Sequence, residues 1–271
     1  MITAFAVVRQ LACLLPFLWC CFWPFAAVAQ SNGNSDPLEA NPGRPTVSTP
    51  ATLTPTGYLQ FETGVLGAEH SGEFDNRTGL NEVIKLAANS RLQFLASAEP
   101  FVISDVGPST ERNPGGFALG AQAVLLPGRK RHPTIAVSYF RSIYGGTAPD
   151  LDIGSSRNSG LVLASFDVRK LHVDTNYIFN EQVQNSVHRL QYGQTLSLAR
   201  PLQGKLAFTG EIWHFSQPFL QADAIGLLLA PTYALQPNLV FDAGFQHGLT
   251  ATSTRWEIFA GFTYLMPKKL W

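Results

Sequence analysis

Apolar side chains recur at every second position from Gly57 to the end of the chain. In residues 254–266, for example, one face carries Trp256, Ile258, Ala260, Phe262 and Tyr264. A period of two puts alternate side chains on opposite faces of a β-strand, whereas a helix needs a period of about 3.6. No segment after residue 30 has a long helical period, so the chain is predicted to be all-β.

The composition suits a barrel that faces lipid. Charged residues make up 14% of the chain, against about 25% in an average soluble domain. The 19 basic and 19 acidic residues cancel, which argues against a nucleic-acid-binding protein, because such proteins carry a basic excess. A low charge content without long apolar runs in the body of the chain is typical of strands that turn one face to lipid.

Twelve segments are predicted to be strands, and their connections alternate in length. The segments are residues 57–67, 79–88, 91–99, 115–126, 133–143, 158–167, 171–180, 186–198, 204–215, 222–234, 239–247 and 254–266. Every second connection is short, whereas the first, third and fifth are long and polar. This asymmetry is typical of outer-membrane barrels. We predict a transmembrane antiparallel up-and-down β-barrel of about twelve strands, with ten as the alternative.

The N-terminal part of the chain divides into two segments before the predicted barrel of residues 57–271. Residues 1–29 have a basic residue, an apolar run and a small-x-small ending, and they are predicted to be a secretory signal peptide rather than a membrane anchor. Residues 30–56 are rich in proline. They are predicted to form a periplasmic extension that becomes ordered only if it docks on a partner or plugs something.

All the cysteines lie in the predicted leader, at Cys13, Cys20 and Cys21. A mature chain without cysteine has no disulfides, no thiolate zinc sites and no cysteine nucleophile. The sequence also has no phosphate-binding glycine loop and no cluster of histidines and acids at metal spacing. We therefore predict no cofactor and no metal.

Charged residues alternate with the apolar face and are predicted to line the lumen. The candidates are Glu62, Lys85, Arg91, His172, Asp174, Arg189, Lys205, Glu211, Asp242 and Glu257. Charges inside a small barrel must be paired or hydrated. Two interpretations stay open: a polar conduit that tunes passage, or a salt-bridge network that fills the lumen. The balance of signs disfavours strong ion selectivity.

Aromatic residues recur near the predicted strand ends. They are Tyr58, Tyr139, Tyr144, Tyr177, Tyr192, Trp213, Tyr233, Trp256 and Tyr264. Girdles at the two lipid–water interfaces explain such positions, and a binding site for an aromatic ligand is the alternative.

One pair of residues suggests catalysis. His214 and Ser216 lie two positions apart on one strand face, where the histidine could deprotonate the serine. Lipid A deacylases of the outer membrane use a His-x-Ser of this kind, but Gln217-Pro218 replaces the rest of their pattern. We predict no catalytic residue and keep a lipid hydrolase as the alternative.

Three stretches resemble one known family. They are NPGRPTVSTPATLTPTGYLQFETGVLG (41–67), GEIWHFSQPFL (210–220) and FDAGFQHGLTATSTRWEIFAGFTYLMPKKLW (241–271). The family consists of outer-membrane barrels, is named after the meta-pathway of phenol degradation and is usually described as transporters. The terminal Trp271 is similar to the aromatic C-terminus that barrel-assembly machinery recognises, although Pro267, Lys268 and Lys269 interrupt the alternation before it.

These observations predict a bacterial outer-membrane channel or passive transporter for small, hydrophobic or aromatic solutes. Its expected partners are outer-membrane lipid, the barrel-assembly machinery and the solute, and not nucleic acid. The alternatives are the lipid hydrolase, a structural or adhesive barrel that transports nothing, and a soluble β-sandwich or propeller.

Overall fold

The computed structural model describes residues 38–129, 132–151, 156–220 and 222–271, which form a β-barrel. Its strands are β1 (Leu59–Glu69), β2 (Asn76–Asn89), β3 (Leu92–Val106), β4 (Ser109–Asn113), β5 (Phe117–Leu126), β6 (Thr134–Tyr144), β7 (Ser156–Val168), β8 (Leu171–Gln184), β9 (Val187–Pro201), β10 (Leu206–Phe215), β11 (Ala224–Gln236), β12 (Leu239–Gly248) and β13 (Trp256–Leu265). The predicted signal peptide and the three cysteines lie outside the described residues. No helix in the described part of the chain is long and apolar enough to cross a membrane.

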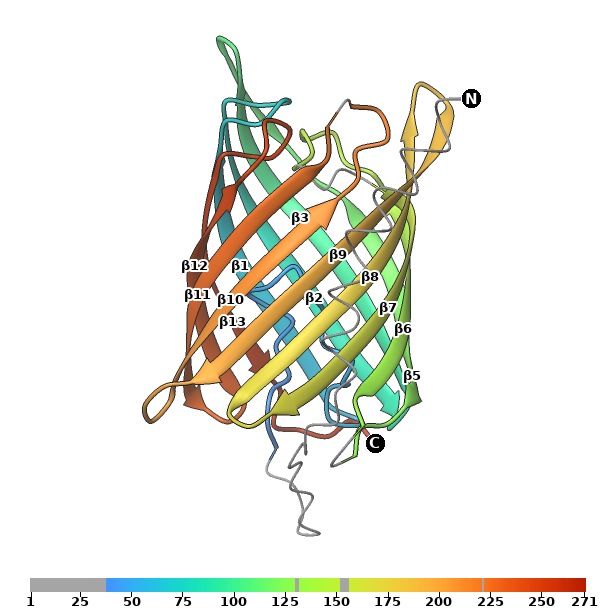
Figure 1. The fold of residues 1–271 in the computed structure, drawn as a ribbon, viewed down its shortest axis with the longest axis vertical. Helices are drawn as coiled ribbons and strands as arrows, with labels where there is room; N and C mark the ends of the chain where they lie inside the picture. The colour runs from blue at the N-terminus through green and yellow to red at the C-terminus, as the bar shows by residue number, and fades with distance from the viewer. Residues whose placement is uncertain (1–37, 130–131, 152–155, 221) are drawn as a thin grey trace.

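Neighbouring strands pair antiparallel around the whole ring (Figure 1). The first and last strands close it, for example through the pairs Phe61–Tyr264 and Val65–Ala260. β4 pairs only with β3, and the two form a hairpin that extends beyond the ring. The other twelve of the thirteen strands form the wall. The predicted all-β fold, antiparallel pairing and number of strands are confirmed.

The strand ends differ from the predicted ones mainly at the end of the barrel that carries the long loops. The segment 100–114 was expected to be a loop, but β3 continues to Val106 and turns at Gly107, whose φ is +57°. β8 also continues past its predicted end at residue 180, to Gln184, and a turn at Asn185 and Ser186 joins it to β9. The two extensions differ in burial: the side chains around the β8–β9 turn are exposed, so no buried face imposes an alternation there, whereas β3 still buries Val102 and Ser104 on one face. Both extensions project above the ring in Figure 1.

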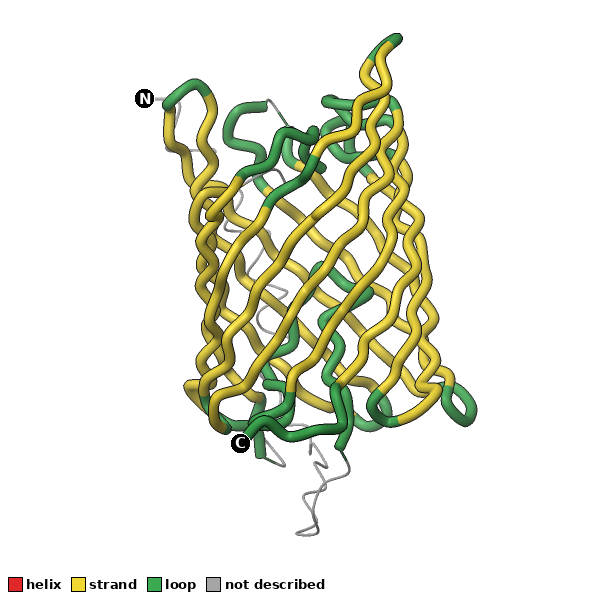
Figure 2. Tube along the Cα trace, turned by 180° about the vertical axis from the view of Figure 1, so that it is seen from behind, coloured by secondary structure: helices red, strands yellow, loops and turns green. Residues whose placement is uncertain are grey.

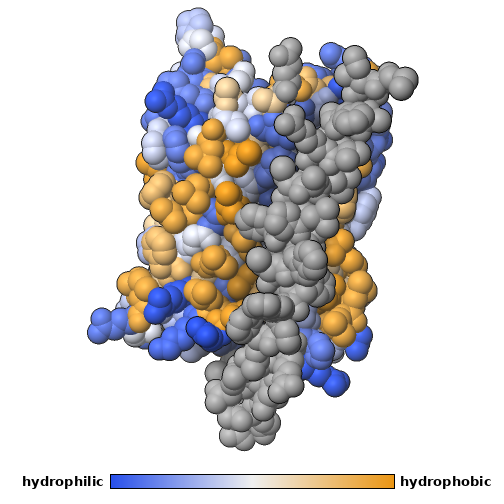
Figure 3. Space-filling model, in the orientation of Figure 1, coloured by the Kyte–Doolittle hydropathy of each residue, from blue (hydrophilic) through white to orange (hydrophobic). Residues whose placement is uncertain are grey.

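The outer surface is apolar in a broad band around the barrel. Exposed side chains there include Val65, Phe94, Val162, Phe245 and Ile258, and Ile258 is 68% exposed. Figure 3 shows this band between two hydrophilic ends on the face in view. Surfaces of this size and character are stable in contact with lipid and costly in contact with water. The alternation found in the sequence therefore separates a lipid face from a lumen face.

Candidate functional site in the barrel lumen

Residues 40–54, called the plug below, fold into the lumen. The Ala40 N–H donates to the carbonyl of Pro237 in the turn between β11 and β12, at 2.8 Å. After the plug, the Gly57 N–H donates to the carbonyl of Ala87 near the end of β2, at 2.9 Å. Figures 1 and 2 show the segment rising from the short-turn end to about mid-height and returning. Residues 38–56, the described part of the predicted extension, thus lie in the lumen and at its short-turn mouth.

The wall binds the first part of the plug through two acidic side chains. Glu62 accepts the Gly43 N–H at 3.0 Å and pairs with Lys85 Nζ at 2.5 Å. Asp242 forms an ion pair of 3.1 Å with the plug residue Arg44. Both carboxylates are nearly inaccessible to solvent, where a charge is tolerated only if it is paired and hydrogen-bonded.

Two glycines make room for the Arg44 guanidinium. Gly64 of β1 and Gly261 of β13 are opposite each other in the sheet. A Cβ added at either position would collide with the Arg44 side chain. The missing side chains therefore form a cradle in the wall that lets Arg44 reach Asp242.

Glu211 of β10 holds the middle of the plug. Its carboxylate accepts three hydrogen bonds, from the Val47 N–H at 2.8 Å, the Ser48 N–H at 2.7 Å and the Ser48 hydroxyl at 2.5 Å. Glu211 is 2% exposed. An extended backbone inside a barrel has no strand partner, so a buried acceptor on the wall must satisfy its N–H groups.

Uncharged side chains hold the rest of the plug. Asn176 accepts the Thr49 N–H at 2.6 Å and donates to the Thr49 carbonyl at 2.9 Å. Gln93 accepts the Thr54 N–H at 2.8 Å. Ser165 and Gln122 bind the backbone between these points. The wall thus binds the plug as it would a peptide ligand, through amide, hydroxyl and carboxylate groups from many strands.

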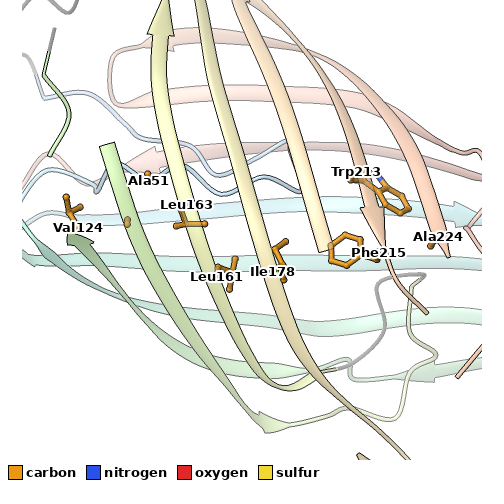
Figure 4. Close-up of a cluster of buried hydrophobic side chains, with 9 residues drawn as sticks. Ala51, Val124, Leu161, Leu163, Ile178, Trp213, Phe215 and Ala224 are labelled. Carbon is orange, nitrogen blue, oxygen red and sulfur yellow. The ribbon is translucent and has the colours of Figure 1, made fainter. Parts of the chain in front are cut away.

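One side of the lumen is apolar, which the sequence analysis did not predict. A buried cluster joins plug and wall, as Figure 4 shows. Its members are Ala51, Val124, Ala136, Leu161, Leu163, Ile178, Trp213, Phe215 and Ala224, with Val47, Leu53 and Phe140 packed against it. Burial of such side chains contributes to holding the plug in place.

Trp213 was predicted to belong to an aromatic girdle on the outer surface, and this prediction is wrong. It points into the lumen, is 1% exposed, and donates its indole N–H to Gln246 at 2.8 Å. The ring lies against Gly226, where a Cβ would collide with it. Phe215 covers Gly193 in the same way. Small residues facing inward on neighbouring strands were the signal that could have placed these rings inside.

A cavity of about 280 Å³ lies next to this cluster. Val47 of the plug forms part of its wall, together with the apolar side chains Phe140, Leu161, Ile178 and Phe215. Serine hydroxyls and the Asn180 amide supply the polar part. Because Asn180, Ser142 and Ser159 belong to the loop-side parts of their strands, the cavity lies on the long-loop side of the plug.

Most of the predicted lumen residues lie on the inner face. Glu62, Lys85, Asp174, Glu211, Asp242 and Glu257 are buried there. His172 lies half-buried at the short-turn rim, 2.7 Å from Asp167 and 3.3 Å from Asp174.

Three of the residues predicted to line the lumen lie outside it. Arg91 is exposed in the turn between β2 and β3, and Lys205 is exposed in the turn between β9 and β10, where its Nζ donates to the Leu235 carbonyl. Arg189 lies on the projecting β8–β9 hairpin, donates to the Pro218 carbonyl and covers the Phe219 ring. Near strand ends, alternation continues into turns and ribbons that no longer enclose the lumen.

His214 and Ser216 lie at the long-loop end of β10, and His214 alternates with the inward-facing Trp213 and Phe215. His214 Nε2 is 2.9 Å from Asp223, whereas the Ser216 hydroxyl accepts the Tyr192 N–H at 3.0 Å. No hydrogen bond joins the two residues within the described part of the chain. Among all the described residues, no three histidine, cysteine or acidic side chains are arranged to hold a metal.

The buried pair of Glu62 and Lys85 leads to a prediction about stability. Lys85→Met should leave a buried carboxylate without its cation and cost about 3–5 kcal/mol in the free energy of unfolding. The double variant Glu62→Leu/Lys85→Met should recover part of this loss. Urea titration in lipid vesicles would measure both. The exposed Lys205→Met is the matched control, and an equal loss there would contradict the expectation.

No protein-family model matches the sequence, and neither does any curated protein. The fold does match solved structures. The outer membrane channel from Pseudomonas putida F1 has a TM-score of 0.56 and 13% identity, with 84% of this chain and 100% of that chain covered. The NanC porin has a TM-score of 0.54 and 9% identity, with 74% and 98% covered. The KdgM porin has a TM-score of 0.50 and 10% identity, with 76% and 98% covered.

The chain therefore has the fold of outer membrane channels and porins. A closed β-barrel with an apolar outer band is the form in which bacterial outer membrane proteins cross the bilayer. The location predicted from the sequence is confirmed.

Proposed function

We propose that the protein is a gated outer-membrane channel for small, uncharged, largely apolar solutes. The observation that carries the proposal is the cavity of about 280 Å³ on the long-loop side of the plug. Its apolar walls and few hydroxyl and amide groups suit a small ring or chain with one polar substituent. Long loops face the outside in barrels of this kind, so the cavity would receive solutes from the medium.

The family resemblance supports a finer proposal. The chain belongs with the barrels named after the meta-pathway of phenol degradation, and its solutes include small aromatic alcohols. Phe140 and Phe215 in the cavity supply faces on which an aromatic ring packs well. Neither Arg44 nor any of the five buried lumen acids lines the cavity, so the first binding step favours solutes without charge.

Filling the cavity should stop uptake. In Ser142→Trp, an indole would occupy the cavity next to Phe140, whereas the matched control Ile143→Trp adds the same ring at the next residue, whose side chain is 58% exposed. The assay is entry of labelled phenol at low concentration into bacteria that lack other channels and produce each variant. We expect most of the protein-dependent uptake to be lost only in Ser142→Trp.

The same assay separates the proposal from a barrel that transports nothing. Unmodified protein that gives no more phenol uptake than an empty vector would contradict the channel. Equal uptake of phenol and of arabinose, a polar solute, would contradict the apolar selectivity while leaving a channel. Heat-dependent mobility on a denaturing gel verifies that each variant forms the barrel.

A further inference from the structure

A polar network interrupts the outer surface at the long-loop end of four neighbouring strands. We call it the rim cluster and define it as Tyr139, Arg141, Asn158, Glu181 and His188. The Tyr139 hydroxyl and Arg141 Nη1 both donate to Asn158 Oδ1, at 2.6 and 2.9 Å. Asn158 Nδ2 donates to Glu181, whose other carboxylate oxygen is 2.6 Å from His188 Nδ1. The contacts therefore join β6, β7, β8 and β9.

The rim cluster faces away from the lumen. Phe140 and Ser142 line the internal cavity, so Tyr139 and Arg141, which alternate with them on β6, point outward. Asn180 lines the same cavity, which places its neighbour Glu181 on the outer face of β8. Side-chain exposures of 31% for Glu181 and 48% for His188 agree with this position.

The network lies where the apolar band ends. One step nearer the middle of the barrel, the outer faces of β8 and β9 carry Phe179 and Leu190, which are 46% and 64% exposed. Tyr139, 53% exposed, marks the same boundary on β6. Aromatic residues of transmembrane barrels lie at the level of the lipid headgroups, so the rim cluster meets the headgroup layer rather than acyl chains.

The rim cluster has guanidinium N–H groups that are available to bind an anion. Both oxygens of Glu181 are occupied by Asn158 and His188. Arg141 uses one N–H on Asn158, and its other N–H groups have no acceptor among the described residues. A second arginine, Arg157, is exposed, directly precedes Asn158 in the chain and is close enough to Glu181 to interact with it electrostatically. Two guanidiniums against one carboxylate complement an anion, and arginine forks match the geometry of phosphate.

We propose that the rim cluster binds a phosphorylated glycolipid of the outer leaflet, with its phosphate on Arg141 and Arg157. The Tyr139 ring packs on the start of an acyl chain, and Asn158 fixes the position of Arg141. This inference rests on the long loops facing the outside and is independent of whether the barrel transports a solute.

The test compares two arginines at opposite ends of the barrel. Arg141→Gln removes the proposed phosphate ligand. Arg200→Gln is the matched control, because Arg200 is exposed near the end of β9 on the short-turn side. The full chain in phosphatidylcholine nanodiscs is titrated with lipid A and with enzymatically dephosphorylated lipid A, and binding is followed by native mass spectrometry.

We expect Arg141→Gln to weaken lipid A binding at least about tenfold, the value of a hydrogen bond to a charged group. Arg200→Gln should bind lipid A as tightly as the unmodified chain does. The unmodified chain should bind dephosphorylated lipid A as weakly as Arg141→Gln binds lipid A. Equal losses in both variants would show general electrostatic attraction and overturn the proposal. Phosphate-independent binding would also overturn it. Because neither readout involves solute flux, failure of the channel proposal leaves this result unaffected.

Discussion

Deletion of residues 40–54 is expected to turn a closed barrel into a conducting pore. The deletion removes the plug and leaves the paired strands intact, since the wall begins at Leu59. The exposed wall would then carry the carboxylates of Glu62, Asp174, Glu211, Asp242 and Glu257. Against these stand two buried cations on the described inner face, Lys85 and Arg77, and Arg77 is paired with a further carboxylate, that of Glu99. A pore with one dominant sign of charge prefers ions of the opposite sign. In planar bilayers, the deletion variant should show a larger conductance and a reversal potential that favours K⁺ over Cl⁻.

A peptide added in trans provides the control for this deletion. A synthetic peptide of residues 40–54 should block the open pore from the short-turn side, because the wall supplies its hydrogen-bond partners. A scrambled peptide of the same composition should not block it. Lack of conductance in a deletion variant that still forms a heat-modifiable barrel would show that something other than the plug closes the lumen. Conductance without cation preference would contradict the charge argument alone.

Replacement of Glu211 should loosen the plug without removing it. In Glu211→Val, the Val47 and Ser48 N–H groups and the Ser48 hydroxyl lose their acceptor. Each buried polar group left without a partner costs about 1–3 kcal/mol. We expect brief conducting events in bilayers and faster proteolysis of the plug. Glu211→Gln keeps one oxygen acceptor, so its effect should lie between those of the unmodified chain and Glu211→Val.

Thr209→Val is the matched control for Glu211. Thr209 is buried on the same face of β10, two residues away, and no described hydrogen bond joins it to the plug. This variant should conduct and resist protease like the unmodified chain. If Glu211→Val behaves like Thr209→Val, then the apolar cluster around Phe215 holds the plug, and the hydrogen bonds to Glu211 only orient it.

The fold was predictable because a single rule, alternation, acts on every strand. Lipid on one side and the lumen on the other impose opposite requirements on successive residues, as on β13 from Trp256 to Leu265. The short connections between successive segments predicted the order of neighbours around the ring. The alternation fails where neither side imposes a requirement, as in the largely exposed β4 and at the projecting end of the β8–β9 hairpin.

The plug was not predictable in detail because its contacts carry no local period. Arg44 meets Asp242 across 198 residues, and neither residue indicates the other in the sequence. The inward polar residues were identifiable from their position in the strands. Whether they face water, each other or a peptide depends on the three-dimensional closure of the barrel. The apolar patch was missed for a related reason: Leu161 and Leu163 suit a lipid face equally well, and only their partners show that they face inward.

The two attachments of the plug at one mouth, near Pro237 and Ala87, have a topological consequence. The described segment enters and leaves the lumen through the same mouth, so it can be withdrawn on that side. Withdrawal breaks side-chain hydrogen bonds such as those of Glu211 and Asn176 and leaves every rung of the strand ladder in place. If the lumen opens by this route, the strands of the barrel stay paired throughout, so opening would be reversible without refolding of the wall. A force that withdraws the loop must act from the short-turn side, whereas a solute that expels it must push from the cavity.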